Sequence, residues 1–289
     1  MSKASENYTA KLRAKSIVLF IVCILLTLMC LVPIYILIIN STRSHVDVIS
    51  SVSFLPGNQL VRNVKELMTN DLYQFDPFVG FKNSAIIAIC STVLSVFFSA
   101  LTSYGLCVYD FKLRGPAFTF ILAVMMVPMQ VTSVGFLQFM IKLGLSDSFI
   151  PLIIPTIAAP PIVFFMRQYL KSSFPLDIVE AARIDGCGEF RTFLTIAIPM
   201  MKPAIAVQAI FAFIANWNNF YQPSMILVSR KFNQLTMPMM INMLKSNDKI
   251  ADYGVIYAGI ALSIIPVVII YLLLSRFIVE GVALGGVKE

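Results

Sequence analysis

Six long stretches without any Asp, Glu, Lys or Arg dominate this sequence of 289 residues. They are residues 16–42, 83–109, 115–141, 148–166, 203–229 and 253–275. A helix that crosses about 30 Å of hydrocarbon needs about 20 apolar residues, and each stretch is long enough to supply them. The sequence therefore predicts an all-α membrane protein with six transmembrane helices.

Composition argues against a water-soluble enzyme, because 58% of the residues are hydrophobic and only 13% are charged, against averages of about 45–50% and about 25% in soluble domains. The five cysteines are scattered, the chain has a single histidine, and no C-x-x-C pair occurs. This spacing predicts neither a metal site nor a disulfide framework. The net charge of +7 comes from basic residues that flank the apolar stretches, which indicates membrane orientation and not nucleic-acid binding.

Basic residues before the first stretch set the orientation. Lys3, Lys11, Arg13 and Lys15 precede an apolar run that is longer than the 7 to 15 residues, roughly, of a signal peptide. We therefore expect a retained first helix with a cytoplasmic N-terminus, and six spans place the C-terminus there too. The predicted segments are a cytoplasmic tail (1–15), a first helix (16–39), an extracytoplasmic segment (40–82), a five-helix core (83–275) containing a cytoplasmic loop (175–199), and a C-terminal tail (276–289).

The extracytoplasmic segment contains a short amphipathic pattern. Apolar residues recur at i, i+4, i+7 and i+8 with polar residues opposite them, which predicts a helix lying on the outer membrane surface. The apolar face is Leu60, Val64, Leu67 and Met68, and the polar face is Arg62, Asn63, Lys65 and Glu66.

Small residues line one face of the second stretch, at steps of three or four: Ser84, Ala88, Ser91, Ser95, Ser99 and Ser103. Such a face lets membrane helices approach closely, so this helix is expected inside a bundle; a polar pore is the other interpretation. Pro128 in the third stretch and four prolines in the fourth predict kinked helices.

The most charged part of the chain lies between the fourth and fifth stretches. Pro175 and Asp177 favour a helix start, Gly186 a turn, and a second helix is expected from Gly188 to Ile198, ending at Pro199. The helix-turn-helix outline offers few base-reading side chains and is tethered to a membrane span. Docking of a cytoplasmic protein is therefore favoured over DNA binding.

Residues Glu180 to Pro199, EAARIDGCGEFRTFLTIAIP, resemble the EAA loop of binding-protein-dependent ABC importer permeases, with Ile198-Pro199 where Leu-Pro is usual. Further features resemble the maltose-type carbohydrate subfamily: Arg167-Gln168-Tyr169, Asp185-Gly186, Trp217-Asn218, and the glycine-containing segment from Gly281 through Gly285-Gly286-Val287-Lys288. The resemblance implies a type I ABC importer permease fold.

The resemblance also implies partners. ATPase coupling is assigned to Glu180, Ala181, Ala182, Asp185 and Gly186, although Asp185 and Gly186 could simply shape the loop. Because no G-x-x-x-x-G-K-[ST] motif occurs, ATP and Mg²⁺ are expected in a separate ATPase and no cofactor in this chain. The implied assembly contains a second permease subunit as heterodimer partner, two ATPase subunits and an extracytoplasmic sugar-binding protein.

The most polar cluster inside a predicted span is Asn216, Trp217, Asn218 and Asn219, followed by Tyr221 and Gln222. An indole face and amide groups suit a sugar, so these residues and, more weakly, Gln130 are candidates for the substrate path. The amides could instead pin helix contacts or cap a broken helix. The outer segment 229–252 is expected either to reach toward the binding protein or to be an ordinary solvated loop, and His45 to be a surface residue.

The sequence therefore predicts a multi-pass bacterial cell-membrane protein that is the permease subunit of an ABC importer for sugars or oligosaccharides. None of the 15 acidic residues, and no Lys or Arg, falls inside the six stretches, which disfavours an ion-coupled secondary transporter and an anionic substrate. A polyol or a glycerol phosphodiester remains an alternative substrate, and a secondary transporter the alternative class.

Overall fold

The computed structural model describes residues 3–70, 73, 75–246 and 252–285. Every regular element in these ranges is helical, which confirms the predicted all-α class. Four runs are long and apolar enough to span a membrane: Lys15–Ser41, Pro77–Val108, Ile150–Ser173 and Tyr253–Ser275. They belong to α1 (Lys3–Ser41), α4 (Pro77–Val108), the series α7 (Ile150–Ile153), η2 (Ile154–Ile157) and α8 (Pro160–Ser173), and α15 (Tyr253–Gly285).

Two further spans are sharply bent. Helix α5 (Arg114–Met125) meets α6 (Met129–Lys142) at 94°, and the helical run Glu189–Met200 meets α12 (Lys202–Trp217) at 80°. Pro128 immediately precedes α6, where its fixed φ and missing N–H interrupt helical bonding. The described part of the chain thus contains four to six candidate spans, and the predicted proline kinks are present.

Helix bounds differ from the charge-free stretches. The helix over the fourth stretch continues to Ser173 and therefore includes Arg167, whereas α12 ends at Trp217, well inside the fifth stretch, and the short α13 (Tyr221–Ile226) follows. Absence of charge marks where a segment can enter lipid, while backbone hydrogen bonding decides where a helix ends. The statement that no Lys or Arg lies in a span was therefore wrong for Arg167 and Lys171 near the end of α8, and also for Lys202 at the bend before α12.

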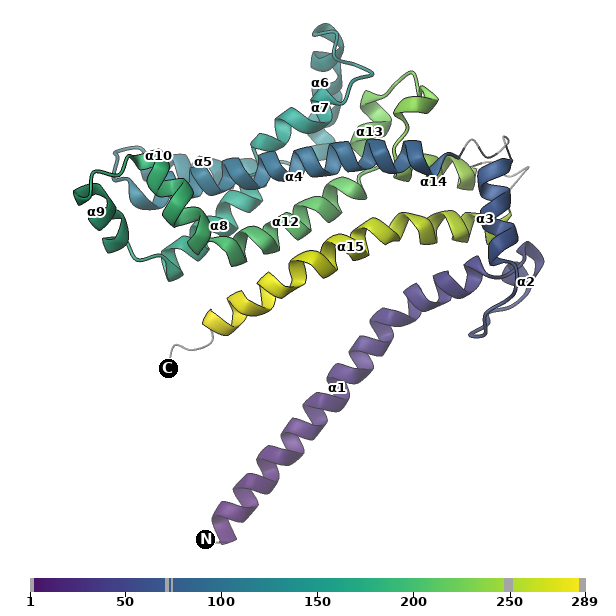
Figure 1. The fold of residues 1–289 in the computed structure, drawn as a ribbon, viewed down its shortest axis with the longest axis horizontal. Helices are drawn as coiled ribbons and strands as arrows, with labels where there is room; N and C mark the ends of the chain where they lie inside the picture. Colours follow the sequence, from purple (N-terminus) through teal and green to yellow (C-terminus); the bar gives the residue numbers. More distant parts are fainter. Residues whose placement is uncertain (1–2, 71–72, 74, 247–251, 286–289) are drawn as a thin grey trace. The chain divides into compact units, whose positions relative to one another are not determined.

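The chain divides into two units, Met1–Tyr73 with Leu244–Leu262, and Gln74–Met243 with Ser263–Glu289. In the second unit α4 lies along α8 and α12 (Figure 1). The small-residue face of α4 is buried throughout, as predicted. Three of its side chains donate hydrogen bonds to successive backbone carbonyls of α8 and of the residue before it: Ser99 Oγ to Ala159, Ser103 Oγ at 2.9 Å to Val163, and Cys107 Sγ to Arg167.

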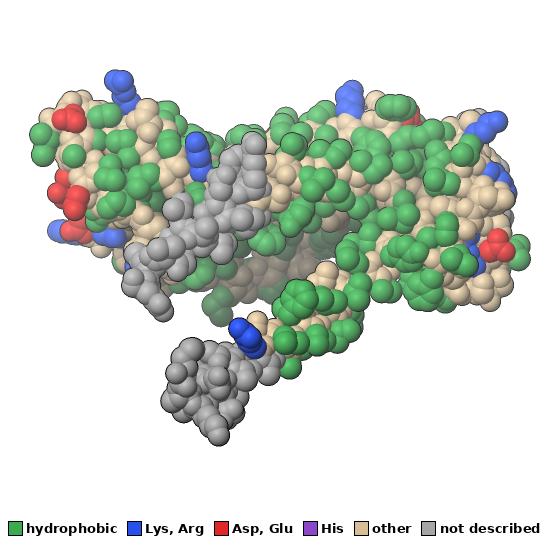
Figure 2. Space-filling view, turned by 60° about the horizontal axis from the view of Figure 1, so that its bottom comes forward, with side chains coloured by type: hydrophobic (Ala, Val, Ile, Leu, Met, Phe, Trp, Pro, Cys, Tyr) green, Lys and Arg blue, Asp and Glu red, His purple; other side chains and the backbone are tan. Residues whose placement is uncertain are grey.

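Hydrophobic side chains cover much of the visible surface in Figure 2 and separate the charged side chains into small groups. Helix α1 illustrates this, because its apolar side chains from Ile17 to Val32 are exposed on all sides. A helix that is apolar all round is stable only in lipid or inside a larger assembly. This surface fits a membrane protein.

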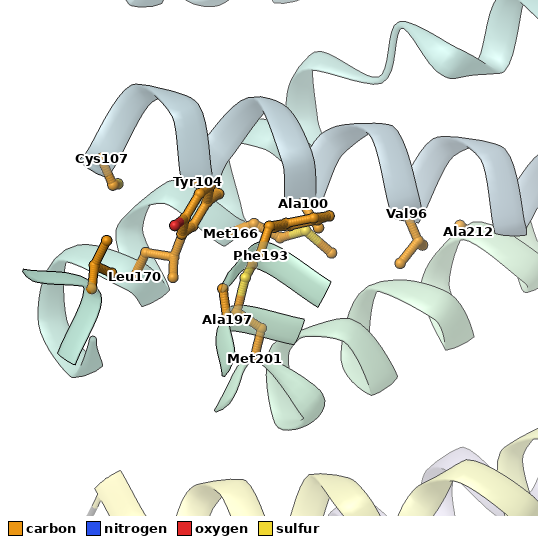
Figure 3. Packing of buried hydrophobic residues seen from close by; sticks show 11 residues of the cluster. Val96, Ala100, Tyr104, Cys107, Met166, Leu170, Phe193, Ala197, Met201 and Ala212 are labelled. Carbon is orange, nitrogen blue, oxygen red and sulfur yellow. The ribbon is translucent and has the colours of Figure 1, made fainter. Parts of the chain in front are cut away.

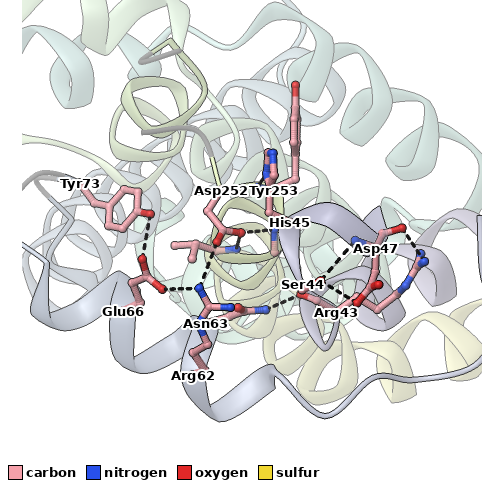
Figure 4. Close-up of polar contacts among 12 residues, drawn as sticks. Arg43, Ser44, His45, Asp47, Arg62, Asn63, Glu66, Tyr73, Asp252 and Tyr253 are labelled. Atoms are coloured by element: carbon pink, nitrogen blue, oxygen red, sulfur yellow. Dashed lines mark hydrogen bonds and ion pairs between the residues drawn. The ribbon is translucent and has the colours of Figure 1, made fainter. Parts of the chain in front are cut away.

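A buried polar residue organises the first unit, which also contains α2 (His45–Ser50) and α3 (Leu60–Thr69). Asn63 of α3 is fully buried and donates from Nδ2 to the carbonyls of Ser41 and Arg43, both at 2.9 Å (Figure 4). Its assignment to the polar face opposite Leu67 was wrong, because both side chains are fully buried, while Leu60 and Met68 of the apolar face are 44% and 48% exposed. The two hydrogen bonds to these carbonyls stabilise the buried side-chain amide of Asn63 and satisfy both acceptors.

Charged and aromatic groups complete this network. The buried Arg43 guanidinium donates to Asn40 Oδ1 and to the carbonyls of Asp47 and Ser51. His45 is half-buried, stacks on Tyr253 with ring centroids 5.4 Å apart, and accepts the Tyr253 N–H at Nδ1. The predicted surface histidine therefore belongs to the packing at the start of α15.

The described part of the predicted outer segment 229–252 is a packed structure. Helix α14 (Met237–Ser246) buries Met237, Met240 and Leu244, so an ordinary solvated loop is excluded for these residues. Residues Asp248 and Lys249 of this segment lie outside the described ranges. On the second unit, Asn83 of α4 donates to the carbonyls of Asn233 and Leu235, both at 2.9 Å, and fixes the start of this segment.

Candidate coupling loop and substrate path

The cytoplasmic loop predicted between the fourth and fifth spans is two short helices joined by a tight turn. Helix α9 (Asp177–Ile184) is followed by Gly186, whose φ of +75° lies in the left-handed region, and by α10 (Glu189–Thr192). The Gly186 and Cys187 N–H groups donate to the carbonyls of Arg183 and Ala182. Such a C-terminal turn favours glycine because it has no Cβ to clash.

One face of α9 anchors the loop. Val179 and Ala182 are 1% and 7% exposed, and Val179 belongs to a buried cluster with Tyr104 of α4, Met166 and Leu170 of α8, and Phe193. Figure 3 shows Phe193 lying between the α4 side chains and Met201. Glu180, Ala181, Asp185 and Gly186 are exposed. The structure thus places four of the five predicted coupling residues on the outward face, and Ala182 on the inward one.

The second helix of the loop is less regular than predicted. Phe193–Ala197 forms a π-helical turn. Of four apolar residues spaced at i, i+3, i+4 and i+7 in this helix, Phe193 and Ala197 are buried, whereas Phe190 and Leu194 are 58% and 41% exposed. A π turn adds a residue between hydrogen-bonded groups and so shifts side chains off the 3.6-residue period. Ile184, two residues before Gly186, is 87% exposed, so exposed apolar side chains occur on both helices of the loop, which the sequence pattern did not reveal.

A polar clamp joins this loop to α4. Arg183 donates to both carboxylate oxygens of Glu189, and the hydroxyl of Tyr109, just after α4, donates to Glu189 Oε2 at 2.7 Å. The hydrogen bonds from Arg183 and Tyr109 hold the pKa of Glu189 below its ordinary value. Burial and the neighbouring carboxylate raise the pKa of Tyr109 to about 12. Sequence reasoning missed the clamp, because Tyr109 and Glu189 are 80 residues apart.

Trp217 occupies a packing position. Its side chain is 2% exposed, lies between Phe81 and Phe213 in stacked geometry, and donates from Nε1 to the Ser263 carbonyl of α15 at 3.0 Å. Both indole faces are therefore covered by protein, and the polar edge is satisfied. In this conformation Trp217 ties α12 to α4 and α15, and it offers no face to a sugar.

The neighbouring amide side chains differ in their surroundings: two of them form hydrogen bonds to nearby residues, and one is exposed. Asn219 Oδ1 accepts the Gln222 N–H and its Nδ2 donates to Gln222 Oε1, so this residue caps α13, while Asn216 donates to the Ala212 carbonyl of its own helix. Asn218 is exposed at the break between α12 and α13. Capping of a broken helix is thus realised at Asn219.

Gln130 lies exposed in the first turn of α6. Ser133 Oγ donates to the Gln130 carbonyl and accepts from the hydroxyl of Tyr221 at 2.8 Å. The structure therefore brings the third predicted span to the residues just beyond Asn219. Gln130 lies just after the bend between α5 and α6, and the amide cluster lies at the break between α12 and α13. Both places are helix ends, where backbone groups lack helical partners.

Comparison with known proteins decides the family. The family described as the binding-protein-dependent transport system inner membrane component matches residues 98–283. This chain belongs to that family. Membership makes it a multi-pass component of a transport system in the inner membrane, and the secondary-transporter alternative is thereby excluded.

Relatives of this inner membrane component cover nearly the whole chain. It is 36% identical over 270 residues to the arabinooligosaccharides transport system permease protein AraQ of Bacillus subtilis, covering 91% of this chain and 92% of AraQ. It is 30% identical to the lactose transport system permease protein LacG of Rhizobium radiobacter, covering 97% and 99%, and 28% identical to the sn-glycerol-3-phosphate transport system permease protein UgpE of Salmonella typhimurium, covering 87% and 90%.

A solved structure confirms the fold of this inner membrane component. A chain from the crystal structure of a bacterial ABC transporter involved in the import of the acidic polysaccharide alginate matches with a TM-score of 0.74 at 22% identity. The match covers 96% of this chain and 98% of the other. The fold is that of an ABC importer permease.

Proposed function

We propose that this chain is one permease subunit of an ATP-driven ABC importer for sugars or oligosaccharides. The observation that carries the proposal is the pair α9–α10, which presents charged and apolar side chains outward while Val179 and Phe193 anchor it to α4 and α8. A surface helix with a rigid base transmits a push from a docked protein to the spans. The relatives named for arabinooligosaccharides and lactose support the substrate class.

In this proposal the exposed residues Glu180, Ala181 and Asp185 contact a separate ATPase subunit. Ala182 supports them from the buried side, and Gly186 sets the turn. ATP and Mg²⁺ belong to the two ATPase subunits, so that this chain needs no cofactor of its own. The loop then faces the cytoplasm together with both termini.

The translocation path is shared with a second permease subunit, and sugar is delivered by an extracytoplasmic binding protein. Asn218 and Gln130 are the two predicted path residues that the structure leaves exposed, and their amides can donate to and accept from sugar hydroxyls. Asn216 and Asn219 shape the break in the fifth span beside them. Trp217 acts by holding α12 in place.

A glycerol phosphate is the second candidate substrate, because one relative is named for sn-glycerol-3-phosphate transport. A phosphorylated substrate requires cationic or multiple N–H donors along the path. In the described spans Arg167 lies near one end of α8 and Lys202 lies at the bend where α12 begins, about 24 Å along the helix from Asn218 at about 1.5 Å per residue. This distribution favours the neutral solute.

The test is ATP hydrolysis by the reconstituted importer. The importer is reconstituted in liposomes from this chain, its partner permease, the ATPase and the binding protein. Its ATPase activity is measured with arabinooligosaccharides, with lactose and with sn-glycerol-3-phosphate, each added separately. We expect a neutral oligosaccharide to stimulate hydrolysis. Stimulation by sn-glycerol-3-phosphate alone would replace the sugar assignment, and an assembled complex that responds to no solute would contradict both.

A further inference from the structure

Arg167 is a buried cation without an anionic partner in the described chain. It lies on α8, two turns before the helix ends at Ser173, and only 8% of its surface is exposed. No described carboxylate pairs with it, and its Nε is buried without any hydrogen-bond acceptor. A buried charge is strongly disfavoured unless it is paired, so an anion that accepts hydrogen bonds from Arg167 would be stabilising.

An aromatic ring holds the guanidinium in place. Its Cζ lies 3.7 Å from the centroid of the Phe118 ring of α5, and Phe118 in turn stacks on Phe164, one turn before Arg167 on α8. Stacking fixes the plane of an arginine while its N–H edges remain available for hydrogen bonds. This geometry leaves the guanidinium N–H groups of Arg167 oriented toward an acceptor that approaches in the plane of the guanidinium.

Two further cations gather at the same ends of α4, α5 and α8. The Arg114 side chain donates from Nε and Nη2 to the carbonyls of Leu106 and Cys107, and the Cys107 thiol donates to the Arg167 carbonyl. Lys171, exposed one turn beyond Arg167, also acts electrostatically on Cys107. Three positive charges therefore surround the end of α4, and no described acidic side chain forms an ion pair with any of them.

The surrounding surface indicates which class of anion suits Arg167. Leu113, Phe164 and Phe165 expose 68%, 37% and 38% of their surface on the same segments, which suits contact with acyl chains. Arg167 lies about 9 Å from the end of its helix at about 1.5 Å per residue, a depth that a lipid headgroup can reach. Basic pockets between membrane helices bind anionic headgroups, and arginine matches a phosphate with two parallel hydrogen bonds.

We propose that Arg167, with Phe118, Arg114 and Lys171, forms a binding site for the phosphate of an anionic phospholipid. The guanidinium turns its unpaired Nε edge toward the phosphate while it stays stacked on Phe118. Lys171 adds a second charge from the exposed side, and Arg114 remains on the α4 carbonyls. The site lies where α5 and α8 meet the base of the coupling loop, so an occupied site stiffens that base.

The experiment measures heat stability of the purified, delipidated importer complex in detergent. Phosphatidylglycerol, phosphatidylcholine with the same acyl chains, and inorganic phosphate are added separately. We expect phosphatidylglycerol to raise the Tm by several degrees and the other two additions to leave it unchanged. An equal rise with phosphatidylcholine would overturn the headgroup assignment, and a rise with inorganic phosphate would overturn the lipid as source.

Variants locate the effect. Arg167→Gln should abolish the rise in Tm caused by phosphatidylglycerol, while Lys112→Gln, which removes an exposed charge from the nearby loop, should retain it. If Arg167→Gln does not assemble, Lys171→Gln serves instead, because its side chain is exposed, and should reduce the rise. The site is refuted if phosphatidylglycerol raises the Tm of both variants as much as that of the unaltered complex. If only Lys171→Gln assembles, an undiminished rise in that variant alone refutes the site.

Discussion

Arg183 and Glu189 form a two-pronged ion pair across the glycine turn of the loop, with Nε to Oε1 at 2.7 Å and Nη2 to Oε2 at 3.4 Å. Glu189 simultaneously accepts the Tyr109 hydroxyl from the end of α4. The clamp therefore links α9, α10 and α4 through a single carboxylate. A displacement of α9 is passed to α4 through this link as well as through the buried Val179.

Breaking the clamp should impair coupling more than assembly. Exposed ion pairs contribute little to stability, so we expect Glu189→Gln to leave the amount of purified complex unchanged and to lower the solute transported per ATP hydrolysed by roughly two- to fivefold. The control is Arg191→Gln, which removes an exposed charge from α10 that forms no described ion pair. An equal fall in both variants would show that charge in the loop, and not the clamp, matters.

The pH dependence of the clamp follows from the pKa shifts of Glu189 and Tyr109. Because the pKa of Glu189 is lowered, its contribution is complete above the ordinary glutamate pKa and is lost as pH falls through the lowered value. Because the pKa of Tyr109 is raised from 10.0 to about 12, its hydrogen bond is present below 10 and lost as pH rises through about 12. The clamp is therefore intact throughout the physiological range.

Ultraviolet titration of tyrosinate tests the Tyr109 assignment. The difference between the unaltered complex and Tyr109→Phe should titrate near pH 12, and the same difference measured in a Glu189→Gln background should move toward 10 because the carboxylate and its hydrogen bond are gone. A difference that titrates at the ordinary value in both backgrounds would contradict the clamp in solution.

The turn at Gly186 should tolerate no side chain. A Cβ at either Gly186 or Gly188 meets no atom within 4 Å, but only Gly186 has a positive φ. Alanine in the left-handed region costs about 1–2 kcal/mol, so Gly186→Ala should reduce ATPase retained on purification while Gly188→Ala should not. Gly186→Asp and Glu180→Lys should leave the subunit inserted and detach the ATPase. Unchanged ATPase content in these variants would remove the coupling assignment.

Local chemistry made much of this arrangement predictable. The serine face of α4, the glycine turn and the proline bend before α6 follow from the steric properties of single residues at known spacings, and all three are present. Burial of Asn63 and the enclosure of Trp217 were not predictable, because each depends on a group far away in sequence: Asn63 bonds to Arg43 and Trp217 to Ser263. The exposure of Phe190 was missed for a local reason, because the π turn Phe193–Ala197 shifts the side chains off the regular helical period.

Trp217 and Asn218 provide a matched pair for the substrate path. Removing a buried tryptophan costs about 3–5 kcal/mol, so we expect Trp217→Ala to lower sugar uptake and the yield of assembled complex by the same factor. Asn218→Ala removes an exposed amide and should lower uptake without loss of complex. Normal uptake per assembled complex in Asn218→Ala would remove Asn218 from the path, and a selective loss of uptake in Trp217→Ala would restore a direct role for the indole.

The first unit should depend on Asn63 for stability. Its Nδ2 is the donor to two backbone carbonyls, of Ser41 and Arg43, and the side chain is fully buried. A buried acceptor that loses its donor costs about 1–3 kcal/mol, so Asn63→Ala should lower the Tm by several degrees, whereas Asn58→Ala, an exposed amide in the preceding loop, should not.

Gly254→Ala should act like Asn63→Ala, because its Cβ would come within 2.8 Å of Asn63 Nδ2 and closer still to the Arg43 carbonyl. Gly135→Ala, where a Cβ meets nothing, is the control. A stable Gly254→Ala variant would mean that α15 does not start against Arg43 and Asn63.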